Sequence, residues 1–201
     1  YGLSKQKLID ENQELKPINP YGNTKMVIEM ILDDLFKSAP NEWKIISLRY
    51  FNPIGAHPSG LIGESPRGVP NNIFPLLMKV ASGNIESLKI YGNDWPTYDG
   101  TGIRDYIHVM DLANGHLLAL ENLISQKPKN IKLNLGTGLE TSVLTLIRTF
   151  ERVNDIKINY EFSRRREGDT AKIVADNSLA KKILNWKSKK SLEEMCIDGW
   201  N

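Results

Sequence analysis

Cysteine is nearly absent from the sequence, and long apolar runs are absent altogether. Cys196 is the single cysteine among the 201 residues, so no internal disulfide can form. A helix that crosses a membrane needs about 18 or more consecutive, mainly apolar residues, and the sequence contains no such run. Because chains without disulfides are typical of reducing compartments, we expect a cytoplasmic protein without a membrane partner.

The sequence also lacks an excess of charge of either sign. Lysine and arginine number 26, aspartate and glutamate 24, which leaves a formal net charge of +2. Nucleic-acid-binding domains usually collect basic side chains on one face, and the only basic triplet here is residues 164–166. We therefore expect no nucleic-acid partner. An apolar content of 40% is enough for a core, in one large domain or two small ones.

A glycine-rich dinucleotide fingerprint is missing as well. The fingerprint Gly-x-Gly-x-x-Gly binds a pyrophosphate where a strand turns into a helix. Gly136 and Gly138 follow a predicted strand and precede a predicted helix, but Thr141 occupies the place of the third glycine. We interpret residues 136–138 as a tight strand–helix turn.

No set of residues has the spacing of a metal site. Zinc sites commonly use two histidines one helical turn apart, or cysteine pairs two to four residues apart. His57, His108 and His116 have neither spacing, and Cys196 stands alone. We expect no metal and interpret the three histidines as structural.

What is present is an alternation of strand and helix patterns. Alternating patterns of this kind favour an α/β architecture, and the long loops 52–70 and 92–102 are rich in proline or glycine, as functional loops often are. Apolar runs predict strands at 43–50, 88–91, 103–109, 131–135 and 156–162. Periodic apolar residues predict helices at 20–38, 73–81, 111–123, 143–153, 179–184 and 192–200. Ser142 and Thr141 are the candidate caps of the helix at 143–153.

The first of these helices has well-defined start and stop residues. Asn19 can cap it, Pro20 suits its first position, and Pro40 follows its end. Five apolar side chains recur at steps of three and four residues and predict one buried face. They are Val27, Ile28, Ile31, Leu32 and Leu35.

Tyr21 and Lys25 lie one turn apart at the start of this helix, so they share one face. Making a phenolate usable near pH 7 requires the tyrosine pKa to fall about three units, roughly 4 kcal/mol. A unit charge ~4 Å away, at an effective dielectric of ~20, supplies about that much. The spacing alone is also compatible with a solvated helix face, since Tyr1 and Lys5 repeat it without an apolar helix behind them.

Motifs along the whole chain extend this pattern. They are residues 20–25 (PYGNTK), 49–58 (RYFNPIGAHP), 70–72 (PNN), 91–94 (YGND), 99–109 (DGTGIRDYIHV) and 165–169 (RREGD). In this order they resemble the UDP-glucose (UDP-galactose) 4-epimerase family of the extended short-chain dehydrogenase/reductase superfamily, over almost all 201 residues.

The resemblance implies an α/β fold of the NAD(P)-binding Rossmann type that lacks its first strands here. Residues 1–52 are expected to end the dinucleotide-binding domain, and 53–201 to build mainly the substrate domain. Residues 103–120 are expected to return to the cofactor domain. The glycine-rich turn and the catalytic Ser or Thr of the family are then expected before Tyr1, and the isolated 201 residues are expected to be inactive.

The resemblance also implies an activity and a set of site residues. The activity is NAD-dependent interconversion of UDP-glucose and UDP-galactose, with Tyr21 as the base on the sugar 4-hydroxyl and Lys25 lowering its pKa. Cofactor contacts are expected from Tyr21, Lys25, Tyr50, Phe51 and Pro53. Arg104 and Arg166 are expected at the diphosphate and Asp169 at the ribose. The remaining expected substrate contacts are Asn52, Asn72, Ile73, Lys89, Ile90, Tyr91, Tyr106 and Ile173.

Ile173 departs from the family pattern, because bacterial members often carry a bulky aromatic residue there. A smaller residue leaves room for an N-acetylated hexose, so a UDP-N-acetylhexosamine 4-epimerase stays an alternative. A nucleotide-sugar 4,6-dehydratase and a nucleotide-sugar-binding piece without turnover are the others. The resemblance further implies a homodimer, formed through the helix that carries Tyr21.

Overall fold

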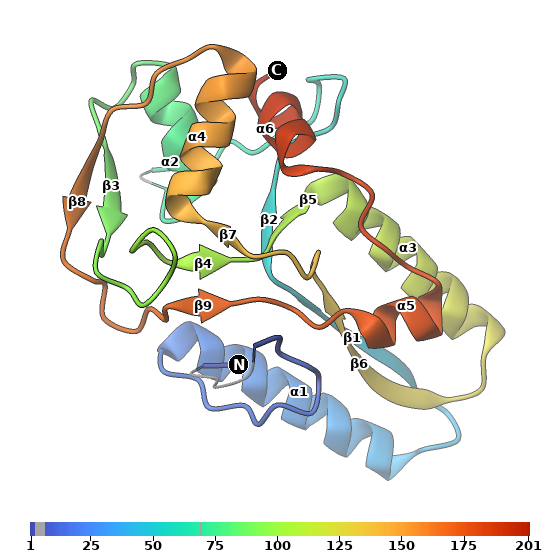
Figure 1. Ribbon diagram of the computed structural model, residues 1–201. Helices are drawn as coiled ribbons and strands as arrows, with labels where there is room; N and C mark the ends of the chain where they lie inside the picture. Colours follow the sequence, from blue (N-terminus) through green and yellow to red (C-terminus); the bar gives the residue numbers. More distant parts are fainter. Residues whose placement is uncertain (3–6, 69) are drawn as a thin grey trace.

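The structure is a computed structural model that describes residues 1–2, 7–68 and 70–201. Lys5, half of the second Tyr-x-x-x-Lys pattern, lies outside the described residues. The fold is α/β, as predicted (Figure 1). Its helices are α1 (Pro20–Ser38), α2 (Ile73–Ala81), α3 (Val109–Ser125), α4 (Val143–Asn154), α5 (Ser178–Leu184) and α6 (Leu192–Trp200). Its strands are β1 (Lys44–Tyr50), β2 (Asn52–Ile54), β3 (Leu88–Tyr91), β4 (Ile103–Arg104), β5 (Tyr106–His108), β6 (Lys129–Leu135), β7 (Thr141–Ser142), β8 (Tyr160–Ser163) and β9 (Lys172–Ile173).

The longest strand pair, β1 and β6, is parallel and has two different faces. One face is apolar: Leu48 of β1 and Leu133 of β6 pack into a buried cluster with α3 and α5, in which Trp186 is the largest side chain. The Trp186 indole N–H donates to the carbonyl of Asp111 (3.0 Å), so the buried polar group is satisfied. Figure 1 shows α3 and α5 beside this strand pair.

The other face of the pair carries polar side chains, and α1 lies against it. Contacts run from Glu29 and Asp33 of α1 to Arg49 of β1 and Lys132 of β6. The buried apolar face predicted for α1 is therefore wrong for the described chain, in which α1 has no buried residue. The polar side of the helix meets the strands, so the apolar side points away, and Val27, Ile28 and Ile31 are exposed (47%, 49% and 59%).

A second apolar cluster lies under α2, α4 and α6. Phe150 of α4 meets Trp200 of α6 edge to face, with ring centroids 5.8 Å apart. The Ser142 side chain caps α4 as predicted, because its oxygen accepts from the amide of Thr145 (3.0 Å). Ser191 and Glu194 form a reciprocal capping box at the start of α6. Figure 1 shows the three helices gathered at one end of the molecule.

The short pair β2–β5 joins the two clusters. Tyr106 and Ile107 are neighbours on β5, so their side chains point to opposite faces. Tyr106 enters the cluster under α2, α4 and α6, whereas Ile107 enters the cluster beside β1 and β6. The boundary predicted after residue 52 remains a prediction, and β2 is the segment where the chain passes from one cluster toward the other.

Two predicted strands differ from the structure. The strand predicted over 103–109 is divided into β4 and β5, with Asp105 between them, and Val109 already begins α3. The strand predicted over 156–162 is restricted to β8 at its far end. Within the described ranges, no helix is both long and apolar enough to cross a membrane.

Candidate functional site

Strand pairing brings four of the predicted substrate residues together. Asn52 of β2 is the register partner of Tyr106 of β5. Two residues before the start of β5, Arg104 of β4 is the register partner of Ile173 of β9. Because β4 and β5 are separated only by Asp105, these two strand pairs bring the four residues into one part of the fold. This part lies where the two apolar clusters meet.

Arg104 is held in place in this part of the fold. Its Nη1 donates to the carbonyls of Ile103 and Thr170, both at 2.9 Å, and its Nη2 lies 3.9 Å from a carboxylate oxygen of Asp169. Two buried hydroxyls near it, those of Tyr106 and Thr170, have no hydrogen-bond partner among the described residues. Burial also raises the pKa of the Tyr106 phenol, so this hydroxyl stays protonated and can donate.

Two consecutive arginines stack on two aromatic rings close by. The Arg166 guanidinium lies 4.4 Å from the ring centroid of Tyr91, and that of Arg165 lies 4.2 Å from Trp95. Arg165 also bonds Asp94 through Nε (2.8 Å), and this hydrogen bond lowers the pKa of the Asp94 carboxyl. Arg166 makes no ion pair within the described part of the chain, so its charge is available to an anionic ligand.

The other predicted substrate contacts lie at a helix start and on an unpaired strand edge. Asn72 precedes α2, and among the described residues its side-chain amide makes no capping bond at this helix N-terminus. Ile73 is the first helical residue. The side chain of Ile90 is buried, which leaves only its backbone for binding. β3 pairs with β8 alone among the described strands, so its second edge offers unpaired backbone groups. Lys89 lies 3.9 Å from Glu161 across that pair.

Tyr21 and Lys25 form a pair at the exposed start of α1. The Asn19 side chain caps the helix by accepting from the amide of Gly22 (2.8 Å), as predicted. The Lys25 ammonium lies over the Tyr21 ring, 5.1 Å from its centroid, and the tyrosine is 72% exposed. Within the described residues, no hydrogen bond, ion pair or ring contact joins this pair to Arg104 or Arg166.

The three remaining cofactor candidates follow one another at the end of β1. Tyr50 is half-exposed, and its ring lies 5.7 Å from that of His116 on α3. Phe51 meets Tyr1 with ring centroids 6.2 Å apart, and Pro53 is exposed on β2. Ligands of parallel α/β sheets bind at the carboxyl ends of strands, and these residues lie at such an end.

Asp105 has a role that sequence reasoning missed. Its buried carboxylate accepts from the amides of Thr137 (2.7 Å), Gly138 (2.9 Å) and Ala175 (3.1 Å), and from the Thr137 hydroxyl (2.7 Å). The amides of the 136–138 turn therefore bind a carboxylate of the chain itself. Gly136 permits this approach, since a Cβ there would lie 2.6 Å from an Asp105 oxygen. The motif RDY contains Asp105, but nothing local indicates its distant partners.

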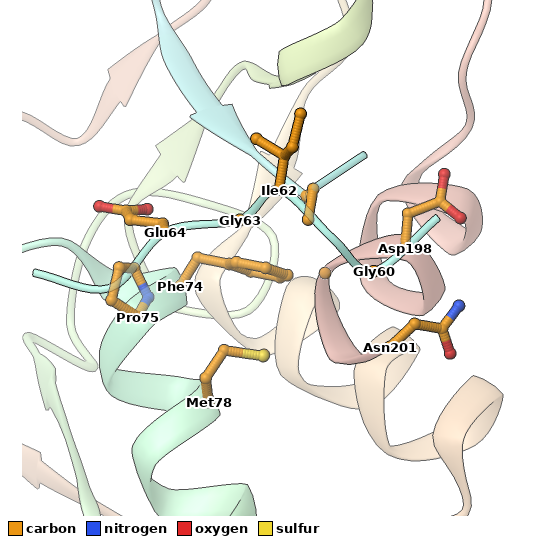
Figure 2. A pocket seen from close by; sticks show the side chains of 12 residues that line it. Gly60, Ile62, Gly63, Glu64, Phe74, Pro75, Met78, Asp198 and Asn201 are labelled. Carbon is orange, nitrogen blue, oxygen red and sulfur yellow. The ribbon is translucent and has the colours of Figure 1, made fainter. Parts of the chain in front are cut away.

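A shallow, half-open pocket in the described chain lies apart from these residues. It has a volume of about 140 Å³ and lies between the 55–64 loop, α2 and α6 (Figure 2). Its acidic side chains are Glu64 and Asp198, and the latter already bonds the buried His108 through Nε2 (3.1 Å). None of the predicted site residues lines it, so it does not belong to the candidate site.

The fold and these contacts describe an α/β protein in which Arg104 lies on β4, Arg166 stacks on Tyr91 of β3, and a tyrosine–lysine pair is exposed at the start of α1. A family model described as GDP-mannose 4,6 dehydratase matches residues 1–198, so the chain belongs to that family.

Individual proteins and solved structures also match this chain. The UDP-glucose 4-epimerase of Bacillus subtilis (strain 168) is 50% identical over 200 residues, which make up 100% of this chain and 58% of that protein. A structure of UDP-glucose-4-epimerase from Stenotrophomonas maltophila, with bound NAD and formylated UDP-arabinopyranose, matches with a TM-score of 0.95 and 45% identity over 99% of this chain and 59% of that one. A structure of UDP-glucose 4-epimerase from Bifidobacterium longum, in complex with NAD+ and UDP, matches with a TM-score of 0.93 and 43% identity. The match covers 98% of this chain and 58% of that one.

These relatives confirm the predicted family resemblance and fold class. The chain resembles the NAD-binding UDP-glucose 4-epimerases over its whole length, and it spans a little under three fifths of theirs. The role of each candidate residue remains a prediction.

Proposed function

We propose that the whole protein is an NAD-dependent UDP-glucose 4-epimerase. The observation that supports the proposal is the presence of an exposed Tyr21–Lys25 pair together with Arg166, which makes no ion pair among the described residues and which we assign, with Arg104, to the diphosphate. The relatives at 50% and 45% identity support it, because their names give this activity.

The end of β1 suits NAD. Tyr50 and Phe51 offer aromatic surface there, and the ammonium of Lys25 has no carboxylate partner in the described chain, so it can bind a ribose hydroxyl. NAD, when bound, would supply the acceptor and donor of a hydride. The residues that we assign to it are Tyr21, Lys25, Tyr50, Phe51 and Pro53.

The chain's own residues would handle protons and hold the substrate. The Tyr21 phenolate takes the proton of the sugar 4-hydroxyl, and Lys25 stabilises the phenolate by its charge. We assign Arg104 and Arg166 to the diphosphate, and Tyr106 and the amides of Asn52 and Asn72 to neutral substrate contacts. Asp169, Ile73 and the β3 edge at Lys89, Ile90 and Tyr91 would hold the nucleoside. Tight binding of the diphosphate and weak binding of the hexose would let the 4-keto sugar turn and present either face to the cofactor.

Replacing Arg166 by Gln is expected to raise the KM for UDP-glucose about 10- to 100-fold with little change in kcat, because a charge-assisted bond to phosphate is worth roughly 1.5–3 kcal/mol. Steady-state kinetics on the full natural chain measure both constants. Arg164→Gln is the matched control, since Arg164 is adjacent and exposed, and among the described residues it makes no ion pair or ring contact with Arg104 or Tyr91. Equal KM values for the two variants would remove Arg166 from the diphosphate site.

Ile173 should set the size of the hexose that is accepted. It is half-buried beside Arg104, and replacing it with Tyr fills the space near the sugar. We expect Ile173→Tyr to lower kcat/KM for UDP-N-acetylglucosamine at least about 10-fold more than for UDP-glucose. Ile173→Val, which only removes a methylene, should retain turnover of both. Failure of the parent enzyme to turn over the N-acetylated sugar rejects the broader specificity.

The family description favours one competing reaction, 4,6-dehydration of a nucleotide sugar. Product analysis separates the two reactions, since an epimerase returns a hexose of unchanged mass and a dehydratase releases water. The exposed apolar residues Val27, Ile28 and Ile31 of α1 support a homodimer through this helix. The single, buried Cys196 supports a cytoplasmic location.

A further inference from the structure

The surface that carries α1 is polar, so directional contacts hold the helix there. Beneath it, β1 contributes Arg49, and β6 contributes Asn130 and Lys132. No side chain of α1 is buried, and the apolar residues of the helix that are most exposed face away from the strands. The position of α1 therefore depends on a few hydrogen-bonded ion pairs, whose geometry is more exacting than apolar contact.

The innermost of these is the pair of Glu29 and Arg49. Arg49 Nε lies 2.7 Å from one carboxylate oxygen of Glu29, and its Nη2 lies 2.5 Å from the other. Both side chains are largely shielded from solvent, with exposed fractions of 13% and 15%. A two-point contact between a planar guanidinium and a carboxylate fixes distance and orientation together.

The third nitrogen of the same guanidinium, Nη1, forms hydrogen bonds with Tyr1 and Glu11. Arg49 Nη1 donates to the Tyr1 hydroxyl (2.9 Å) and to the carbonyl of Glu11 (3.2 Å), and the guanidinium lies 4.8 Å from the Tyr1 ring centroid. Burial raises the pKa of the Tyr1 phenol, which stays protonated and donates to the side chain of Asn134. Arg49 thus joins α1, β1 and the first residues in one network.

A second anchor lies one turn further along α1. Asp33 accepts from Lys132 Nζ through both oxygens, at 2.8 Å each, and from the side chain of Asn130 at 2.7 Å. Burial opposes its ionisation, but these hydrogen bonds hold the pKa of Asp33 below its ordinary value. The carboxylate is thus charged near neutral pH and pairs with Lys132.

The candidate catalytic pair lies on the same ridge of α1 as the two anchors. Tyr21, Lys25, Glu29 and Asp33 follow one another at steps of four residues. Glu29 is the residue of this series directly after Lys25. We propose that Glu29 and Arg49 are positioning residues, which fix the axial position and rotation of α1 and so set where Tyr21 and Lys25 meet the substrate. This inference rests on the proposed function.

The test compares Glu29→Gln with wild type in the full natural chain. Glutamine keeps the shape but weakens the two-point contact, and a displacement of about 1 Å can cost ~100-fold in rate. We expect kcat for UDP-glucose to fall about 10- to 100-fold with KM changed less than ~2-fold. We also expect the acid limb of the kcat–pH profile to move to higher pH, because Lys25 then stabilises the phenolate less well.

Asp34→Asn is the matched control. It removes a carboxylate from the same helix, but Asp34 is exposed and pairs only with Lys37 on that helix (3.1 Å). Its kcat and pH profile should equal those of wild type. If Glu29→Gln does not fold, Arg49→Lys gives the same test, since lysine keeps the charge but has no planar fork.

The outcomes separate this inference from the function on which it rests. A Glu29→Gln enzyme with wild-type kcat and pH profile overturns the inference, even if its melting temperature falls, because the pair is then only structural. A Tyr21→Phe enzyme with full activity overturns the proposed function, and the positioning role with it. An inactive Tyr21→Phe enzyme beside an unaltered Glu29→Gln enzyme rejects only the positioning role.

Discussion

Tyr21→Phe is expected to lower kcat for epimerisation by about 10³- to 10⁴-fold, at the upper end of what a positioned acid–base group supplies. Phenylalanine keeps the ring that faces Lys25 and removes only the hydroxyl, so the helix and its cap at Asn19 remain intact. Binding of UDP should be unchanged, because the residues assigned to the diphosphate, Arg104 and Arg166, make no contact with Tyr21 in the described chain. Turnover and calorimetric titration with UDP, on the full natural chain, measure the two effects.

The geometry of the pair adds a second expectation for the same experiment. In the structure the Lys25 ammonium lies over the ring at 5.1 Å from its centroid, and Tyr21 is exposed. An exposed pair is screened by water, and bound ligands that exclude water strengthen the attraction between the ammonium and a phenolate. Lys25→Met should therefore shift the acid limb of kcat to higher pH with substrate bound.

Tyr160→Phe is the matched control for the loss of a tyrosine hydroxyl. Tyr160 is partly exposed on β8, and its ring contacts only Phe162 among the described rings. Its removal should leave kcat at the wild-type value. A Tyr21→Phe enzyme that turns over as fast as Tyr160→Phe would show that another group takes the proton.

Local sequence was sufficient for most helices. The bounds predicted for α1, α2 and α6 agree with the structure, because capping residues and prolines mark helix ends within a few residues of sequence. Ser142 was predicted as a cap from its position alone, and its side chain does cap α4. These signals act through the backbone of neighbouring residues, so no knowledge of distant contacts is needed.

Which face of α1 lies against the strands could not be predicted in the same way. Apolar periodicity indicates which side chains share a face, but the surface beneath the helix comes from β1 and β6, many residues later. That surface carries Arg49 and Lys132, whose partners Glu29 and Asp33 look like ordinary solvated charges in the sequence. The helix therefore turns its polar side inward, against the periodicity rule.

The residues of the candidate site could be predicted individually from the sequence, but their spatial arrangement could not. Arg104, Tyr106 and Arg166 were predicted from family motifs, and the register that aligns Arg104 with Ile173 became visible only in the structure. The division of the predicted strand 103–109 into β4 and β5 likewise involves contacts with residues that are distant in the sequence. Asp105 separates β4 from β5, and its carboxylate binds the 136–138 turn and Ala175, which lie 32 to 70 residues further along.

Asp105→Asn is expected to destabilise the folded chain by about 2–3 kcal/mol, because a buried donor that loses its acceptor costs roughly 1–3 kcal/mol. If the new amide nitrogen takes the place of one oxygen, it faces the amides of Gly138 and Ala175. In the other orientation it faces the amide of Thr137, and only the Thr137 hydroxyl can turn to accept. Both orientations oppose donor to donor, so the variant cannot restore the network.

The pH dependence of stability distinguishes this cause from simple loss of packing. Burial raises the pKa of Asp105, and its four hydrogen bonds offset this only in part. The folded chain then holds a proton at a pH where the unfolded chain has lost it, so wild-type stability falls as pH rises through that window and is level above it. Denaturant unfolding of the full chain between pH 4 and pH 8 should show this slope in wild type. Asp105→Asn, which cannot titrate there, should lack it, whereas an identical slope in both would assign the effect to another carboxyl.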